Sequence, residues 1–258
     1  MSGASSLVSS VAADAEAIGV MLTNQQQDQL ANYRDLLLTW NTRFNLTAIR
    51  EPKQVEQRLF LDALRMLPEI ERRLAGGAPA PSVADVGTGA GFPGMVFAIV
   101  HPDWPITLIE ATAKKVRFLE HVATELELGQ ATPVHARAED LGHDQAYRGA
   151  FDVAVARAVA SLPALLELCA PLLRRGGHAL FPKSSDIADE LADGRRVAPM
   201  VGMRLNGDGQ LPASTTRLIT AVKVDATPSH YPRRAGIPAR EPLRGAVPAK
   251  LLAQGGTR

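Results

Sequence analysis

The apolar positions of the first 80 residues recur at helical spacing. Asn24, with Gln27 three positions later, has the pattern of a capping box and predicts the start of a helix. The apolar side of this helix repeats every three or four residues, at Leu30, Tyr33, Leu37 and Trp40. The run Asn-Leu-Thr at 45–47 ends it, and Pro52 suits the first position of the next helix. The apolar stripe of that second helix comprises Val55, Leu59, Leu64 and Leu67. Glycine and proline at 76–81 predict a linker, so residues 1–80 are expected to form an N-terminal helical cap.

From residue 82 short apolar runs alternate with helical stretches. The expected strands are 83–86, 106–109, 132–135, 151–156 and 178–181, and the expected helices are 95–100, 114–128, 163–173 and 186–191. This alternation predicts an α/β fold: a Rossmann-like parallel sheet with helices on both faces.

The end of the chain has a different pattern. Two extended runs, 200–205 and 217–224, flank the sequence Asn-Gly-Asp-Gly at 206–209, which predicts a turn between two antiparallel edge strands. Residues 81–227 are therefore expected to form the α/β domain. Residues 228–258 are rich in proline and arginine and are expected to form a mobile or loosely docked tail.

The composition excludes several classes of protein. With 46% hydrophobic and 21% charged residues, the chain is globular rather than disordered. The single Cys169 excludes a disulfide framework, and the six histidines lack metal-ligand spacing, so no metal is expected. No apolar window is long enough to span a membrane, and no Lys or Arg precedes Arg34, so a cytoplasmic location is expected. The net charge of +1 hides a basic end: residues 204–258 hold nine basic and three acidic residues, which suits either a polyanionic partner or solubility.

A glycine-rich turn follows the first expected strand, at 87–94. Such a turn lies beside nucleotide ligands in doubly wound sheets, and Gly89 to Gly94 also fits the G-x-G-x-x-G pattern of nicotinamide binding. Glu110, at the end of the second strand, suits a ribose hydroxyl in either case. The loop and this acid alone therefore leave a dinucleotide and S-adenosylmethionine both open.

Two further acids favour the methyl donor. Asp85 stands two residues before Gly87, where its carboxylate would complement the ammonium and sulfonium charges of S-adenosylmethionine but repel a pyrophosphate. Ala138 and Glu139 follow the third strand, a position from which to contact an adenine edge. The alternatives are that Asp85 caps a turn and that Glu139 faces solvent.

These residues resemble one protein family. The run DVGTGAGFPG at 85–94 closely resembles the cofactor loop of the small-subunit (16S) ribosomal RNA methyltransferase G family, also called glucose-inhibited division protein B. Four more runs match in order: NLTAI at 45–49, KKVRFL at 114–119, ARA at 156–158 and YPRRAG at 231–236. The similarity spans about residues 24–243.

The resemblance implies a seven-stranded methyltransferase sheet and a reaction. The implied enzyme is an S-adenosylmethionine-dependent methyltransferase acting on N7 of a guanine in the 530 loop of 16S rRNA (position 527 in standard rRNA numbering), with S-adenosylhomocysteine as product. The implied donor contacts are Asp85, Gly87, Gly89, Phe92, Glu110, Ala138, Glu139 and Arg157. Leu59 and Ala63 stand where the family usually has His and Ser, and Ser184 stands where a Gly is expected after Lys183, which affects the expected RNA contacts.

Guanine N7 carries a lone pair and no proton, so we expect no general base; catalysis is expected to come from alignment, with positioning by Arg157. A surface salt bridge is the alternative for this arginine. Phe92 could receive the flipped base, although packing is the more ordinary role for it.

The expected RNA-binding cations lie at the start of the helix 114–128, just after the strand 178–181, and in the tail. They are Lys114, Lys115, Arg117, Lys183, Arg233 and Arg234. The first three share the first turn of a helix, where the helix dipole disfavours cations, which suggests phosphate contacts. Simple exposure to solvent is the alternative for each of these three singly.

Other functions stay open at this stage. They are a methyltransferase of the same fold with another substrate, and an S-adenosylmethionine-binding ribosome assembly factor without turnover. A nicotinamide oxidoreductase would require the five ordered matches to be coincidence. The expected partner is 16S rRNA or the small ribosomal subunit, with no DNA or membrane, and the protein is expected to be a monomer.

Overall fold

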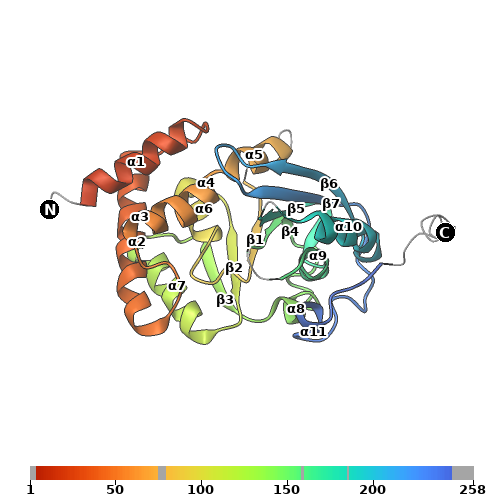
Figure 1. Ribbon diagram of the computed structural model, residues 1–258. Helices are drawn as coiled ribbons and strands as arrows, with labels where there is room; N and C mark the ends of the chain where they lie inside the picture. The colour runs from red at the N-terminus through yellow and green to blue at the C-terminus, as the bar shows by residue number, and fades with distance from the viewer. Residues whose placement is uncertain (1–3, 75–79, 158–159, 185, 246–258) are drawn as a thin grey trace.

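A mixed seven-stranded sheet forms the centre of the computed structural model, which describes residues 4–74, 80–157, 160–184 and 186–245 (Figure 1). Its order is β3-β2-β1-β4-β5-β7-β6; β1 to β5 are parallel, and β7 pairs antiparallel with both of its neighbours. The strands are β1 Val83–Val86, β2 Ile106–Glu110, β3 Ala131–His135, β4 Phe151–Val155, β5 Leu173–Lys183, β6 Met203–Gln210 and β7 Arg217–Lys223. The expected α/β architecture and the antiparallel edge pair are confirmed.

Helices cover both faces of this sheet (Figure 1). In chain order they are α1 Ala4–Glu16, α2 Asn24–Phe44, α3 Pro52–Val55, the π-helix η1 Glu56–Phe60, α4 Leu61–Leu64, α5 Leu67–Leu74, α6 Gly94–Val100, α7 Ala113–Glu125, α8 Ala138–Leu141, α9 Leu162–Cys169, α10 Ala188–Val197, the 3₁₀ helix η2 Ala198–Val201 and α11 Ile237–Arg240. The apolar residues separate into two cores, one on each face.

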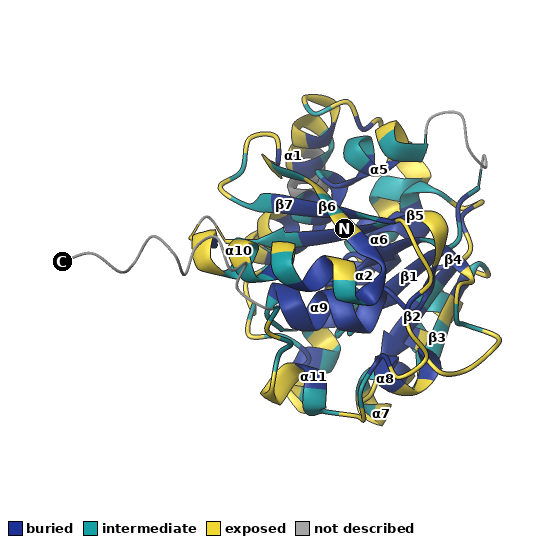
Figure 2. Cartoon of the chain, turned by 90° about the vertical axis from the view of Figure 1, so that its right-hand side faces the viewer, coloured by how far each residue is buried: buried dark blue, intermediate teal, exposed yellow. Residues whose placement is uncertain are grey.

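Successive side chains along a strand point to opposite faces of the sheet and so belong to different cores. Val83 and Val153 face the first core, which contains the buried sides of α1, α2 and α4 to α7. Ala84 and Ala154 face the second, which is filled by α9 with parts of α8 and α10. Strand β1 and helix α9 are accordingly dark blue throughout in Figure 2. The helices before residue 75 thus share one core with the first face of the sheet.

The start of α2 differs from the expected one by a single position. Thr23, rather than Asn24, is the N-cap: its hydroxyl accepts from the Gln26 backbone N–H, and the Gln26 side chain accepts from the Thr23 N–H. Both residue types cap helices well, so the pattern alone could not separate them. The expected end is confirmed, because Asn45 adopts the left-handed conformation directly after Phe44.

The predicted turn at 206–209 is wrong. These residues belong to β6, and the chain reverses between Leu211 and Thr216. Gly207 pairs with Thr220, and a Cβ atom on Gly207 would lie 2.6 Å from the Thr220 hydroxyl. The glycine therefore permits a close approach of two strands, a role that composition does not distinguish from a turn.

Four further boundaries differ from the expected ones. Helix α9 ends at Cys169 rather than 173, and β5 then begins at Leu173, well before the expected residue 178. Helix α10 begins at Ala188, two positions later than expected. Met200 lies in η2 rather than in the following strand.

The described part of the tail is docked, which contradicts the expectation of a loose segment. Tyr231 and Pro238 are buried, and 237–240 form α11 against α9. The linker expected at 76–81 and the tail beyond 245 lie largely outside the described residues.

Candidate donor and RNA site

Asp85 lies at the base of the glycine loop and is completely buried. Its Oδ2 accepts hydrogen bonds from the Thr88 hydroxyl at 2.6 Å and the Gly94 N–H at 2.8 Å. Its Oδ1 is buried without a hydrogen-bond partner among the described residues. Burial raises the pKa of this carboxyl group to about 6. Gly94 must be glycine, because a Cβ atom there would lie 2.8 Å from the same carboxylate.

Glu110 braces the other side of the loop from the end of β2. Its carboxylate accepts from the Gly89 N–H at 3.1 Å and from the Thr112 N–H at 2.8 Å. Lys115 lies 3.7 Å from the same carboxylate. The structure thus brings two buried acids to one loop, from the adjacent strands β1 and β2.

Ala138 and Glu139 lie just beyond β3 and are both buried. Glu139 does not face solvent: its Oε1 accepts a hydrogen bond from the Gly236 N–H at 2.7 Å. The C-terminal segment therefore reaches the edge of the sheet at which the glycine loop lies, a contact between residues 97 positions apart.

Arg157 follows β4, the other neighbour of β1. Its guanidinium donates to the Arg58 carbonyl at 2.5 Å and lies 3.4 Å from the Asp62 carboxylate. Its Nη1 is buried and has no partner among the described residues. Burial lowers the pKa of this arginine, while the charges of Asp62 and Asp85 oppose that shift. The salt bridge given above as the alternative for Arg157 is therefore present, with Asp62 as its partner. It leaves the Nη1 end of the guanidinium free for a ligand.

Phe92 packs rather than projecting from the loop. Its ring stacks on Tyr33 with centroids 5.2 Å apart and lies near Phe60, and it is 7% exposed. The Tyr33 hydroxyl donates to the carbonyl of Ala90, so α2 is tied directly to the loop. Tyr33, expected on the apolar side of this helix, is confirmed as a core residue, and the partly buried Trp40 packs against the buried Phe118 of α7.

The expected RNA-binding cations do not form one cluster. Lys114 and Arg117 are exposed on the first turns of α7. Lys183 donates to the Ala160 carbonyl and pairs with Glu190 at 2.6 Å. Arg234 is exposed, whereas its neighbour Arg233 pairs with the buried Glu167.

A hollow of about 400 Å³ joins Arg157 and Lys183. Asp62, Met66 and the loop residues Thr215 and Thr216 also line it. It lies where the carboxyl ends of β4 and β5 meet α4. This arrangement gives space for a substrate next to Arg157.

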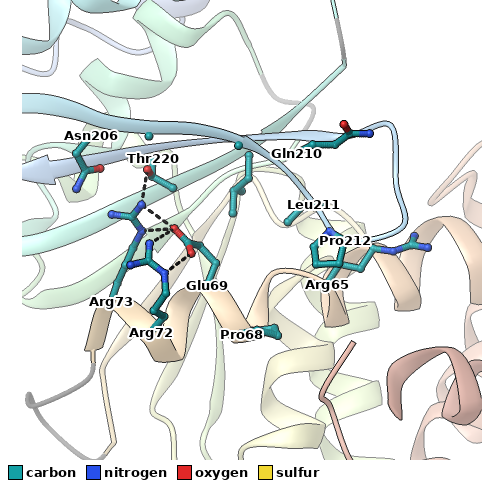
Figure 3. Close-up of a pocket in the computed structure, with 13 residues that line it drawn as sticks. Arg65, Pro68, Glu69, Arg72, Arg73, Asn206, Gln210, Leu211, Pro212 and Thr220 are labelled. Atoms are coloured by element: carbon teal, nitrogen blue, oxygen red, sulfur yellow. Dashed lines mark hydrogen bonds and ion pairs between the residues drawn. The ribbon is translucent and has the colours of Figure 1, made fainter. Parts of the chain in front are cut away.

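Figure 3 shows a second hollow, of about 490 Å³, between α5 and the β6–β7 hairpin. Arg65, Arg72 and Arg73 line it from one side. Arg73 donates to Thr220, both Arg72 and Arg73 pair with Glu69, and Arg65 holds the Ala213 carbonyl at 2.8 Å. The sequence interpretation missed these arginines; the adjacent pair Arg72–Arg73 in an otherwise amphipathic helix was the available signal.

No group of three or more His, Cys, Asp or Glu residues suited to a metal occurs in the described part of the chain. Cys169 is buried, and burial raises its thiol pKa. Within those same residues, no helix is long and apolar enough to cross a bilayer.

The residues at the loop fit S-adenosylmethionine. Asp85 Oδ1 is an unpartnered buried acceptor for a cationic ligand, and Glu110 keeps free lone pairs for ribose hydroxyls. Fold and site together define an S-adenosylmethionine-dependent methyltransferase. A family model described as rRNA small subunit methyltransferase G matches residues 26–206. The chain belongs to that family, as the five sequence runs predicted.

Curated relatives agree over nearly their full length. A protein named ribosomal RNA small subunit methyltransferase G from Alkaliphilus oremlandii is 38% identical over 234 residues, 89% of this chain and 96% of the relative. A protein of the same name from Roseiflexus sp. is 42% identical over 232 residues, 89% of this chain and 97% of its own.

The solved structure of magnesium protoporphyrin IX methyltransferase from Synechocystis PCC 6803 shares the fold. Its TM-score is 0.51 at 15% identity, covering 76% of this chain and 97% of the other.

Proposed function

We propose that the protein transfers a methyl group from S-adenosylmethionine to N7 of a guanine in the 530 loop of 16S rRNA, releasing S-adenosylhomocysteine. The observation that carries the proposal is that two buried side chains at the carboxyl edge of the sheet each keep one polar atom without a hydrogen-bond partner. Asp85 retains an acceptor for the donor, and Arg157 retains a guanidinium N–H beside a substrate-sized hollow. Membership of the family supplies the RNA class.

The bound donor supplies an already activated methyl group on a positively charged sulfur. Guanine N7 attacks with its own lone pair, so the protein need not remove a proton first. Its task is to align the base, and such alignment is worth about 7–11 kcal/mol when the geometry is good. Arg157 is suited to this task because Arg58 and Asp62 fix one edge of its planar guanidinium.

The RNA backbone would be held by cations around this edge. Lys114 and Arg117 are exposed in the first turns of α7, the helix that follows β2, while Lys183 lines the hollow of Arg157. The arginines of the α5 hollow extend this set toward the β6–β7 hairpin. Such contacts would set affinity and register, whereas selection of one guanine requires base contacts. We also propose that the enzyme works as a cytoplasmic monomer.

Site-specific chemical cleavage tests the reaction. The protein is incubated with radiolabelled S-adenosylmethionine and small ribosomal subunits from a strain that lacks the enzyme, in parallel with free 16S rRNA. The RNA is then cleaved at N7-methylguanine. A single new cut in the 530 loop is expected, and comparison of the two substrates shows which one is used.

Other outcomes distinguish the alternatives. Label at another position would retain the enzyme class and reject the target base. Donor binding without any labelled RNA would favour an assembly factor without turnover. Subunits from the parent strain, already methylated at the target, provide the control and should accept no label.

A further inference from the structure

An ion pair between the half-buried Arg233 and a buried acid holds the segment 228–241 against the sheet domain. Glu167 in α9 is fully buried. Its Oε1 accepts from the Arg233 backbone N–H at 2.8 Å and from Nε at 2.9 Å, and its Oε2 accepts from Nη2 at 2.8 Å. Arg233 therefore presents both its backbone and its side chain to one carboxylate. A buried charge of this kind depends strongly on its partner.

Two more side chains bind backbone carbonyls of the residues that precede Arg233. Arg148 donates to the carbonyls of Thr227 at 2.7 Å and Tyr231 at 3.0 Å. The ring of His143 bonds to the Pro232 carbonyl at 2.7 Å. The path of the segment is thus fixed by backbone contacts on both sides of Tyr231.

The same segment reaches Glu139 through Gly236. The Gly236 N–H donates to one oxygen of that buried carboxylate, which leaves the other oxygen available. A hollow of about 550 Å³ lies here, lined by Glu139 and Asp140 from α8 and by Arg234 and Ile237 from the segment. Figure 1 shows α8 and α11 side by side at this end of the sheet.

We infer that the segment 231–237 forms a wall of the donor site and that Arg233 is a positioning residue for donor binding. This inference rests on the proposed function, because Glu139 is there a donor contact. Arg233 acts through the segment: it holds Gly236 against Glu139, and Gly236 orients the carboxylate. The expectation that Arg233 binds RNA phosphate is replaced by this role, since its guanidinium is engaged by Glu167.

An exposed arginine outside the proposed wall provides the control. Donor affinity is measured by calorimetric titration of S-adenosylhomocysteine into the full chain, without RNA, for Arg233→Ala and Arg240→Ala. We expect Arg233→Ala to weaken binding by about tenfold, within the usual range of coupling between linked sites. Arg240 is exposed at the end of α11 and does not line the hollow, so Arg240→Ala should leave donor affinity unchanged. In turnover assays, Arg233→Ala should raise the KM for the donor while kcat and the KM for RNA stay at the wild-type values.

A purely structural role predicts a different result. If Arg233→Ala only reduced the folded fraction, the binding stoichiometry would fall and the Kd of the remaining sites would not change. That result would overturn the inference. Arg233→Lys should restore little affinity, because an ammonium cannot reproduce the paired contacts to Glu167.

A double-mutant cycle tests the route through Glu139. The effect of Arg233→Ala on donor affinity should largely disappear in a Glu139→Ala background, because the two residues act on one contact. Equal loss in both backgrounds would overturn the route.

Failure of the inference is separable from failure of the proposed function. A wild-type protein that binds no S-adenosylhomocysteine would reject the proposed function itself. Normal wild-type binding with an unaffected Arg233→Ala variant would reject the inference alone. Loss of RNA affinity with unchanged donor affinity would return Arg233 to an RNA contact.

Discussion

Asp85 and Arg157 stabilise each other's charge from the ends of the neighbouring strands β1 and β4. Each also has one buried polar atom without a partner in the described chain, Oδ1 of the acid and Nη1 of the arginine. Buried polar atoms are usually paired in proteins, and we propose that ligand atoms pair with these two at the carboxyl edge of the sheet.

The donor affinity should depend on pH through Asp85. Burial raises the pKa of this acid to about 6 from 3.8, so its carboxylate is largely protonated at pH 5 in the donor-free protein. If the donor requires the carboxylate, its affinity should rise about tenfold between pH 5 and pH 7, following the ionised fraction. Calorimetric titration of S-adenosylmethionine across this range, without RNA, measures the effect.

The Asp85→Asn variant is the control for this titration. It should bind the donor weakly with little dependence on pH over the same range. The stability of the donor-free wild type should change in the opposite sense: because the folded pKa exceeds the unfolded one, the free energy of unfolding falls as pH rises from about 4 to 6. A wild-type affinity that is flat with pH would remove Asp85 from charge recognition.

Arg157→Lys should lower kcat more than it changes donor affinity. The lysine keeps a positive charge but cannot hold the Arg58 carbonyl and a substrate group in one plane. Misplacement of a reacting group by about 1 Å can reduce the rate about 10²-fold, so we expect a loss of that order in single-turnover methylation of small subunits. Arg58→Ala is the matched control, because it removes the neighbouring charge and retains the carbonyl that Arg157 contacts.

The glycine loop and its acids could be predicted because they lie close together in the sequence. The run from Asp85 to Gly94 is continuous, and Glu110 follows the next strand, so strand–turn–helix logic places them at one edge. The same logic could not show that Asp85 keeps an unpartnered oxygen, since that depends on how Thr88 and Gly94 share the other one.

The long-range contacts were not predictable in the same way. Glu167 lies in an apolar helix, and only the fold brings it to Arg233, 66 positions later. Glu167 is the one charged residue of α9, and a buried carboxylate needs a cationic or hydrogen-bonding partner, so the sequence could have indicated that such a partner exists but not which residue it is. The error at Gly207 has a similar origin, because its contact is with a strand that lies beyond the turn.

Tyr33→Phe should destabilise the protein and loosen the glycine loop. The change removes the hydroxyl that donates to the Ala90 carbonyl and leaves this buried acceptor unpaired, while the ring stacking on Phe92 remains. The expected decrease in the free energy of unfolding is about 1–3 kcal/mol, measured by urea denaturation. Thr39→Val, on the exposed side of the same helix, should have a much smaller effect. Equal effects would show that the bond to Ala90 contributes little.

Cations at the proposed RNA-binding edge should contribute to the salt dependence of RNA affinity. Lys114 and Arg117 are exposed in the first turns of α7, the helix after β2, and each phosphate that they neutralise should contribute about 0.7–0.9 to the slope of log K against log salt concentration. The double Lys114→Ala, Arg117→Ala variant should therefore bind small subunits more weakly and with a smaller slope. Arg72→Ala tests the α5 hollow in the same way.

Arg175, exposed near the amino end of β5, is the control position, and its replacement by Ala should leave the slope unchanged. An equal decrease for Arg175→Ala would mean that the salt effect reports overall charge, whereas an unchanged slope for the double variant would exclude α7 from the RNA interface.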